Sequence, residues 1–293
     1  MTSDRIETRE RSQYLRGLPT VKSTTRVMSF TSGKGGVGKT NTVVNFGIAL
    51  ARAGKSVLIL DADLSLANID VLLGLEVQYT LNDFIKGRKA LEEIIIDGPE
   101  GISIIPASSG IESICNLEPP EHLMILEAVE KIGWKYDYLL IDTPAGIGSD
   151  VMFFNSASNE VVCVITSDPA SLTDAYALIK VLSKKYGEKS LSVIVNNVPT
   201  NNQATSAFRR LNEAVGKFLQ VELKYLGYIP SDQAVHQAVG QRKGLLMEYP
   251  SSKAAMAITS MAERVDCEFH SFKLKGGMQF FFKQLLEVGG YGA

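Results

Sequence analysis

The sequence has few cysteines and lacks a hydrophobic run long enough to span a membrane. Its three cysteines, Cys115, Cys163 and Cys267, stand far apart and form no C-x-x-C pair. Disulfide frameworks and zinc knuckles need paired cysteines, so we expect neither, and we expect a reducing compartment. The polar, charged residues 1–26 have no apolar core like that of a signal peptide, and no apolar run reaches about 20 residues. These absences predict a cytoplasmic protein whose contact with a membrane, if any, is peripheral.

A large excess of one charge is also absent. The 293 residues carry a formal net charge of −2, with 45% hydrophobic and 21% charged residues. This balance does not indicate a protein that coats nucleic acid, although it leaves room for a local basic patch. The length and the hydrophobic content suit one large α/β domain with a sizeable core.

A glycine-rich stretch organises the chain. Residues 32–40 read S-G-K-G-G-V-G-K-T, which fits the phosphate-loop pattern G-x-x-x-x-G-K-[ST]. The apolar residues 27–31 before it predict a buried strand, and residues 42–53 after it predict a helix closed by Gly54. Glycine lets the backbone curl so that its N–H groups and the helix N-terminus face phosphate oxygens. The predicted nucleotide-binding residues here are Gly33, Lys34, Gly35, Gly36, Val37, Gly38, Lys39, Thr40 and Asn41.

Two further runs place acidic residues beside this loop. Residues 56–61 form an apolar run that ends in Asp61, with Asp63 two positions later, and residues 136–142 form another that ends in Asp142. The carboxyl ends of parallel strands meet at the ligand-binding edge of a sheet. We therefore predict that Lys39 contacts the β- and γ-phosphates and that the Thr40 hydroxyl and Asp142 hold Mg²⁺. The glycine-punctuated residues 143–148 are placed to sense the γ-phosphate.

Strand and helix patterns alternate along the rest of the chain. Strands are predicted over 101–106, 160–166, 191–196 and 225–230, and helices over 119–132, 171–186 and 203–219; residues 80–83 and 171–174 resemble capping boxes. This alternation predicts an α/β fold, with a doubly wound, mostly parallel sheet and helices on both faces. We assign residues 27–270 to this domain.

The two ends of the chain have other patterns. Residues 1–26 are polar and arginine-bearing, and residues 4–16 fit either a short partner-binding helix or a flexible tail. Residues 271–293 contain an apolar stripe at helical spacing. That stripe fits either a helix packed on the core or an amphipathic helix that binds a membrane. Its apolar members are Met278, Phe281, Phe282, Leu285 and Leu286.

Lys34, the second lysine of the loop, gives the sequence a family resemblance. K-G-G-V-G-K-T resembles the deviant Walker A loop of the MinD/ParA group of ATPases. The blocks at 60–70, 142–147 and 227–230 are similar to the same group, and those at 68–74, 106–110 and 173–179 resemble its flagellar-placement branch, the FlhG/FleN type. This similarity runs from about Val27 to Val288 and implies a MinD-like P-loop NTPase fold.

The resemblance implies roles for individual residues. Lys34 would complete the nucleotide site of a partner subunit, Asp63 would position or polarise the attacking water, and Lys39 would assist catalysis. Asp61 would serve as a secondary group around the metal. Asn196, at a strand end, matches the adenine-recognising position, and Pro230 and Asp232 are further predicted nucleotide-binding residues. The implied ligands are ATP and Mg²⁺.

The family's biology implies an ATP hydrolase that switches between a monomer and a membrane-associated homodimer and regulates flagellar number and location. The implied position is the inner face of the bacterial cell membrane, reached through Phe281, Phe282, Leu285 and Leu286. The implied partners are FlhF, a GTPase of the signal-recognition type, and C-ring or transcription-regulator proteins. Residues 10–16, however, keep only part of the N-terminal motif that activates that GTPase.

Two other functions on the same scaffold stay open, and a third is rejected. A division-site ATPase of the MinD type shares the chemistry and differs in its partner. A ParA-type partition ATPase needs a basic surface for DNA, which the net charge of −2 disfavours. An iron–sulfur carrier needs cluster cysteines near the dimer axis, and because the cysteines of this sequence are isolated we expect no iron–sulfur cluster.

Overall fold

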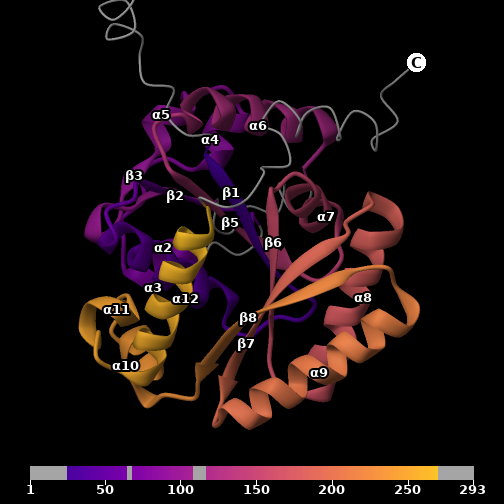
Figure 1. Cartoon of the computed structure of the whole chain (residues 1–293). Coiled ribbons are helices and arrows are strands. Elements are labelled where there is room, and N and C mark those ends of the chain that lie inside the picture. Colours follow the sequence, from indigo (N-terminus) through magenta and orange to yellow (C-terminus); the bar gives the residue numbers. More distant parts are fainter. Residues whose placement is uncertain (1–24, 65–67, 108–116, 270–293) are drawn as a thin grey trace, which may run out of the picture.

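The structure is a computed structural model, and it describes residues 25–64, 68–107 and 117–269 (Figure 1). Within these ranges one sheet has the strand order β3-β4-β2-β5-β1-β6-β7-β8. All neighbouring strands are parallel except β3, which pairs antiparallel with β4. The predicted doubly wound, mostly parallel sheet is thus confirmed. The strands are β1 (Arg26–Ser32), β2 (Val57–Asp61), β3 (Ile96–Asp97), β4 (Ser103–Ile105), β5 (Tyr138–Ala145), β6 (Glu160–Ile165), β7 (Ser190–Val198) and β8 (Glu222–Pro230).

Helices cover both faces of the sheet, because the buried strands are apolar on both sides. In β2, Val57 and Ile59 pack with α2 and α12, whereas Leu58 and Leu60 face the opposite cluster with α5 and α6. A third cluster joins β6 and β7 to α8 and α9. The helices are α2 (Lys39–Arg52), α3 (Ile69–Leu73), α4 (Leu81–Ile85), α5 (Leu91–Ile94), α6 (Pro119–Gly133), α7 (Ser149–Ser156), α8 (Pro169–Tyr186), α9 (Asn201–Phe218), α10 (Gln233–Gly240), α11 (Leu245–Glu248) and α12 (Lys253–Phe269), with a 3-10 turn at Pro99–Gly101.

Three helices begin earlier than predicted: α9 begins at Asn201 instead of residue 203, and the starts of α2 and α8 have local causes. Helix α2 begins at Lys39, three residues earlier than predicted, because the phosphate loop itself forms its N-terminus. Helix α8 begins at Pro169 with Asp168 as its N-cap, so the predicted capping role of Ser171 is wrong. The Asp168 carboxylate accepts the Ser171 N–H, and the Ser171 hydroxyl accepts the N–H of Thr166 instead. A proline fits the first helical turn because that position needs no N–H donor.

Two predicted features lie outside the described residues: the helix over 4–16 and the apolar stripe at 277–288. Cys115 lies outside them as well. None of the helices in the described part of the chain is long and apolar enough to cross a membrane.

Candidate nucleotide site

The phosphate loop joins β1 to α2 at the carboxyl edge of the sheet. Gly36 and Gly38 adopt φ values of 78° and 82°, which L side chains rarely reach, and Gly38 is the N-cap of α2. The first N–H groups of an α-helix have no intrahelical acceptor, and the helix dipole is positive at this end. The loop therefore ends in a helix N-terminus suited to bind a phosphate group.

The glycines of the loop do not share one role. A Cβ atom at Gly33 would lie 2.2 Å from the carbonyl carbon of Asp174 in α8, so this glycine allows the loop to pack on that helix. A Cβ atom at Gly35 would meet nothing, and Gly35 has no positive φ. Gly33 therefore also serves close packing on α8, and the predicted contacts of these glycines with phosphate stay predictions.

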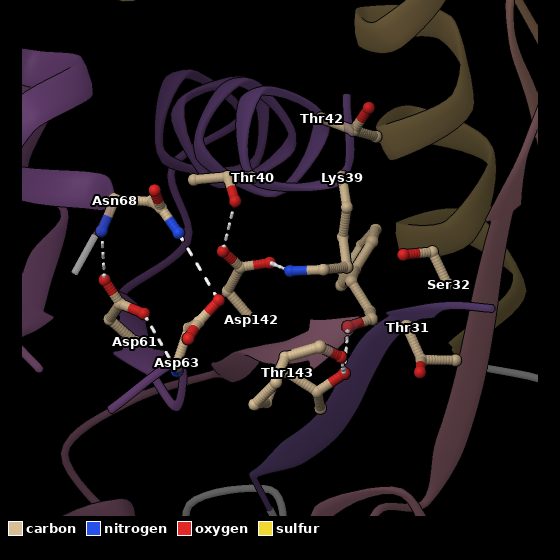
Figure 2. A network of polar contacts seen from close by, with 12 residues as sticks. Thr31, Ser32, Lys39, Thr40, Thr42, Asp61, Asp63, Asn68, Asp142 and Thr143 are labelled. Carbon is tan, nitrogen blue, oxygen red and sulfur yellow. Dashed lines mark hydrogen bonds and ion pairs between the residues drawn. The ribbon is translucent and has the colours of Figure 1, made fainter. Parts of the chain in front are cut away.

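Asp142, in β5, contacts the two residues that close the phosphate loop, Lys39 and Thr40 (Figure 2). Its carboxylate is fully buried and forms an ion pair with the Lys39 ammonium group. The Thr40 hydroxyl donates to the second carboxylate oxygen at 2.6 Å. Mg²⁺ binds oxygen ligands and usually keeps waters and phosphate oxygens in its shell. The adjacent Thr40 and Asp142 oxygens fit that chemistry, and when bound there Mg²⁺ would neutralise phosphate charge.

Asp61 lies beside Asp142, since the two residues are paired in the register of β2 and β5. Burial, followed by the charge of Asp142, raises the pKa of Asp61 to about 7. Its oxygens accept the backbone N–H groups of Asp63, Asn68 and Ile69 at 3.1 to 3.3 Å. Asp61 therefore organises the turn after β2, and its predicted role near a metal stays a prediction.

Asp63 points toward the same edge as Asp142 in Figure 2, and its carboxylate accepts a hydrogen bond from the Asn68 side-chain amide at 3.4 Å. The sequence interpretation gave Asn68 no role of its own. Asn68 follows Asp63 by only five residues, which the sequence shows. Only the fold shows that the Asn68 side chain reaches back to Asp63.

Lys34 and Lys39 point to different carboxylates. The Lys34 ammonium lies 3.1 Å from Asp168, and both side chains are about half exposed. This contact, with two backbone N–H groups, lowers the pKa of Asp168. Lys34 is thus on the surface of the loop, whereas Lys39 is 7% exposed against Asp142. Asp168 was missed by sequence reasoning as a loop partner, although an Asp-Pro at a helix start marks a cap.

The residues predicted to contact adenine lie at the ends of β7 and β8. The Asn196 amide donates to the Val37 carbonyl at 2.7 Å, so it touches the back of the phosphate loop. Pro230 ends β8 and is half-buried. Asp232 caps α10 and also accepts the N–H of Ala254 in α12, which lowers its pKa. The structure thus places Asn196 at the loop and gives Asp232 two capping bonds, and the adenine contacts stay predictions.

Two of the three cysteines lie in the described part of the chain. Cys163 is buried within β6 and Cys267 is exposed on α12. No group of three or more His, Cys, Asp or Glu side chains within residues 25–64, 68–107 and 117–269 is arranged to hold a metal ion by itself. A magnesium site that uses phosphate oxygens and waters needs no such group.

The fold and the loop define a P-loop NTPase, and the family comparison agrees. The family model described as "ParA: NUBPL iron-transfer P-loop NTPase" matches residues 23–266, so the chain belongs to the ParA family. Among curated proteins, it is 41% identical to the antiactivator FleN of Pseudomonas aeruginosa, over 89% of this chain and 94% of that protein. It is 35% identical to the flagellum site-determining protein YlxH of Helicobacter pylori, over 92% of each chain.

A solved structure extends this comparison to a bound ligand. The septum site-determining protein MinD of Pyrococcus horikoshii, complexed with Mg-ADP, superposes with a TM-score of 0.70 and 31% identity. The match covers 83% of this chain and 96% of that one. The resemblance to MinD-type ATPases and to their flagellar branch is thereby confirmed.

Proposed function

We propose that this chain is a Mg²⁺-dependent ATPase that regulates flagellar number and placement by switching between a monomer and a homodimer. The similarity to FleN and YlxH along nearly the whole chain supports the flagellar assignment. The single observation that supports the switch is that the two lysines of the loop have different environments. Lys39 is buried on Asp142, whereas Lys34 extends to the surface, where a second subunit can reach it.

The chemistry is hydrolysis of the γ-phosphate by in-line attack of water, in which positioning and electrostatics supply most of the catalysis. Lys39 and the α2 N-terminus would hold the phosphates, and Thr40 and Asp142 would hold the metal. Asp63, oriented by Asn68, would position or polarise the attacking water. Lys34 of one subunit would stabilise charge on the nucleotide of the other.

The membrane and partner assignments complete the proposal. ATP-bound dimers would present two copies of the stripe at 277–288, and two weak membrane anchors on one particle bind more tightly than one. The complex would sit on the inner face of the cell membrane and contact FlhF, C-ring or transcription-regulator proteins. A division-site role differs only in these partners, so a deletion strain with altered flagellar number and normal septa separates the two.

Multi-angle light scattering with Mg²⁺ and a non-hydrolysable ATP analogue tests the switch. Lys39→Ala should remain a monomer because it cannot hold the phosphates. Lys34→Ala should bind nucleotide within about threefold of wild type yet dimerise weakly, since exposed charges contribute little within one subunit. Lys189→Ala, an exposed lysine at the amino edge of the sheet, is the matched control and should dimerise normally. Dimers of wild-type strength in Lys34→Ala or Lys39→Ala would refute the proposed switch.

A further inference from the structure

A buried histidine–aspartate pair links α6 to α7, the helix that follows the loop after Asp142. The His122 Nε2 atom lies 3.1 Å from an Asp150 carboxylate oxygen, and the two residues are each 6% exposed. The His122 ring also stacks on Phe153 with 4.0 Å between ring centroids. Asp150 further accepts the Ser149 hydroxyl and the Leu117 N–H at 3.4 and 3.5 Å.

Stability alone is a weak reason to bury such a pair. The desolvation of buried polar and ionic partners offsets much of their attraction, and apolar replacements of similar volume are often as stable or more stable. The surroundings of His122 are apolar, since α6 and α7 otherwise contribute Ile125, Val129 and Phe154 to the same core. The pair is therefore better explained as a contact that fixes the position of α7 than as a source of added stability.

The position of α7 matters because this helix follows the loop after Asp142. Strand β5 ends at Ala145, the loop spans residues 146–148, and Asp150 lies in the first turn of α7. The Gly146 N–H donates to the Ser32 carbonyl at 2.8 Å, so the loop is bonded to the start of the phosphate loop. At the other end of α7, the buried Asn155 amide donates to the Thr31 hydroxyl at 3.0 Å.

These contacts fix α7 at two ends. Asn155 ties its C-terminal turn to β1, and Asp150 ties its first turn to His122 in α6. The loop at 146–148 leaves from that first turn, and its Ile147 side chain is 55% exposed. A shift of the first turn would therefore move the segment that connects Asp142 to the surface.

We propose that His122 and Asp150 are positioning residues for ATP hydrolysis, which set the loop at 146–148 against the phosphate loop and couple α6 to the nucleotide site. This inference rests on the proposed ATPase function. Neither residue touches the nucleotide in this account, so both act through the loop. A partner bound to α6 would reach the nucleotide site by the same route.

Three substitutions in the full-length protein test the pair. His122→Phe keeps a ring of similar shape for stacking on Phe153 but removes the hydrogen bond, and Asp150→Ala removes the carboxylate. Asp150→Asn, which keeps an acceptor oxygen, should restore most of the activity. Ile125→Val, a fully buried change on the same helix, is the control for lost packing. The measurements are kcat and KM for ATP, thermal unfolding, and hydrogen exchange at residues 146–149.

We expect kcat to fall about tenfold in His122→Phe and Asp150→Ala, with KM within about twofold, because small misplacements of reacting groups are costly. Amide exchange at residues 146–149 should accelerate in both, and not in Ile125→Val. The proposal would be overturned if His122→Phe and Asp150→Ala lowered kcat no more than Ile125→Val does, at an equal loss of unfolding temperature. If Asp150→Ala fails to fold, His122→Phe decides. If the wild-type protein hydrolyses no ATP, the proposed function fails. Unchanged amide hydrogen exchange at residues 146–149 in His122→Phe would separately refute the role of the pair.

Discussion

At the scale of single residues, Gly33 shows that a motif position can require glycine for packing. The space for its Cβ atom is occupied by the backbone of α8 at Asp174 and Ala175, which cannot move as the end of a side chain can. Gly33→Ala should lower the free energy of unfolding by about 1–3 kcal/mol, the usual cost of overpacking, and weaken ADP binding. Gly35→Ala meets open space and is the matched control for the free energy of unfolding. Urea unfolding measures both variants, and nucleotide titration measures ADP binding by Gly33→Ala; equal losses of stability at the two positions would contradict the packing account.

Asp61 gives a second residue-scale prediction, on pH. Its pKa is 3.8 in an unfolded chain and about 7 in the fold, so the folded protein holds a proton that the unfolded chain has lost between these values. The free energy of unfolding should therefore fall by a few kcal/mol as pH rises from about 4 to about 7, because of this group alone. Above about pH 7 the contribution of Asp61 should stay level. Urea unfolding without nucleotide and magnesium should show this slope.

Asp61→Asn removes the titrating proton, so the variant should lose most of the decline between pH 4 and 7. It would also lose part of the hydrogen bonding to residues 63, 68 and 69, which lowers stability by a similar amount at every pH. Asp97→Asn, an exposed change on β3, should keep the wild-type slope. An unchanged slope in Asp61→Asn would show that burial of Asp61 costs far less than its surroundings indicate.

At the scale of elements, the sequence predicted strands better than the final helices. Buried parallel strands are continuous apolar runs that end in polar residues, as in β2 and β5, and such runs are visible without the fold. The sequence interpretation proposed no element between Asp232 and the stripe at 277–288, yet α10, α11 and α12 lie there. Helix α12 packs on α2 and β8 through Ile258, Met261 and Val265, and small alanines fill the space between them. This stripe was overlooked although its residues recur at helical spacing.

The same scale explains which parts of the site could be predicted. The phosphate loop, Asp61 and Asp142 follow from local patterns, because a loop between a strand and a helix and an acid at a strand end are contiguous in sequence. Contacts across the fold were not predictable in this way. The Lys34–Asp168 ion pair and the Asn155–Thr31 hydrogen bond each join residues more than 120 positions apart, and only the strand order brings them together.

At the scale of the whole molecule, the ATPase domain and the C-terminal stripe should be separable. Within the described residues, α12 (Lys253–Phe269) already packs on α2 and β8 through its buried face. Removal of residues 277–293 should therefore leave ADP binding and the unfolding temperature nearly unchanged. The same truncation should abolish sedimentation with anionic liposomes in Mg-ATP. A large drop in unfolding temperature would instead identify the stripe as part of the core.

A point substitution distinguishes membrane binding from a general loss of the tail. Phe281→Glu and Leu285→Glu place charges on the apolar stripe, where burial in a lipid interface is costly, and should reduce liposome sedimentation at least tenfold. Lys283→Gln changes a residue mainly off the stripe and should reduce it far less. Because dimers carry two stripes, Lys34→Ala should lose sedimentation to a similar degree as the glutamate variants while its stripe stays intact. Liposome binding by Lys34→Ala at wild-type strength would show that one stripe suffices and that membrane attachment does not report the dimer.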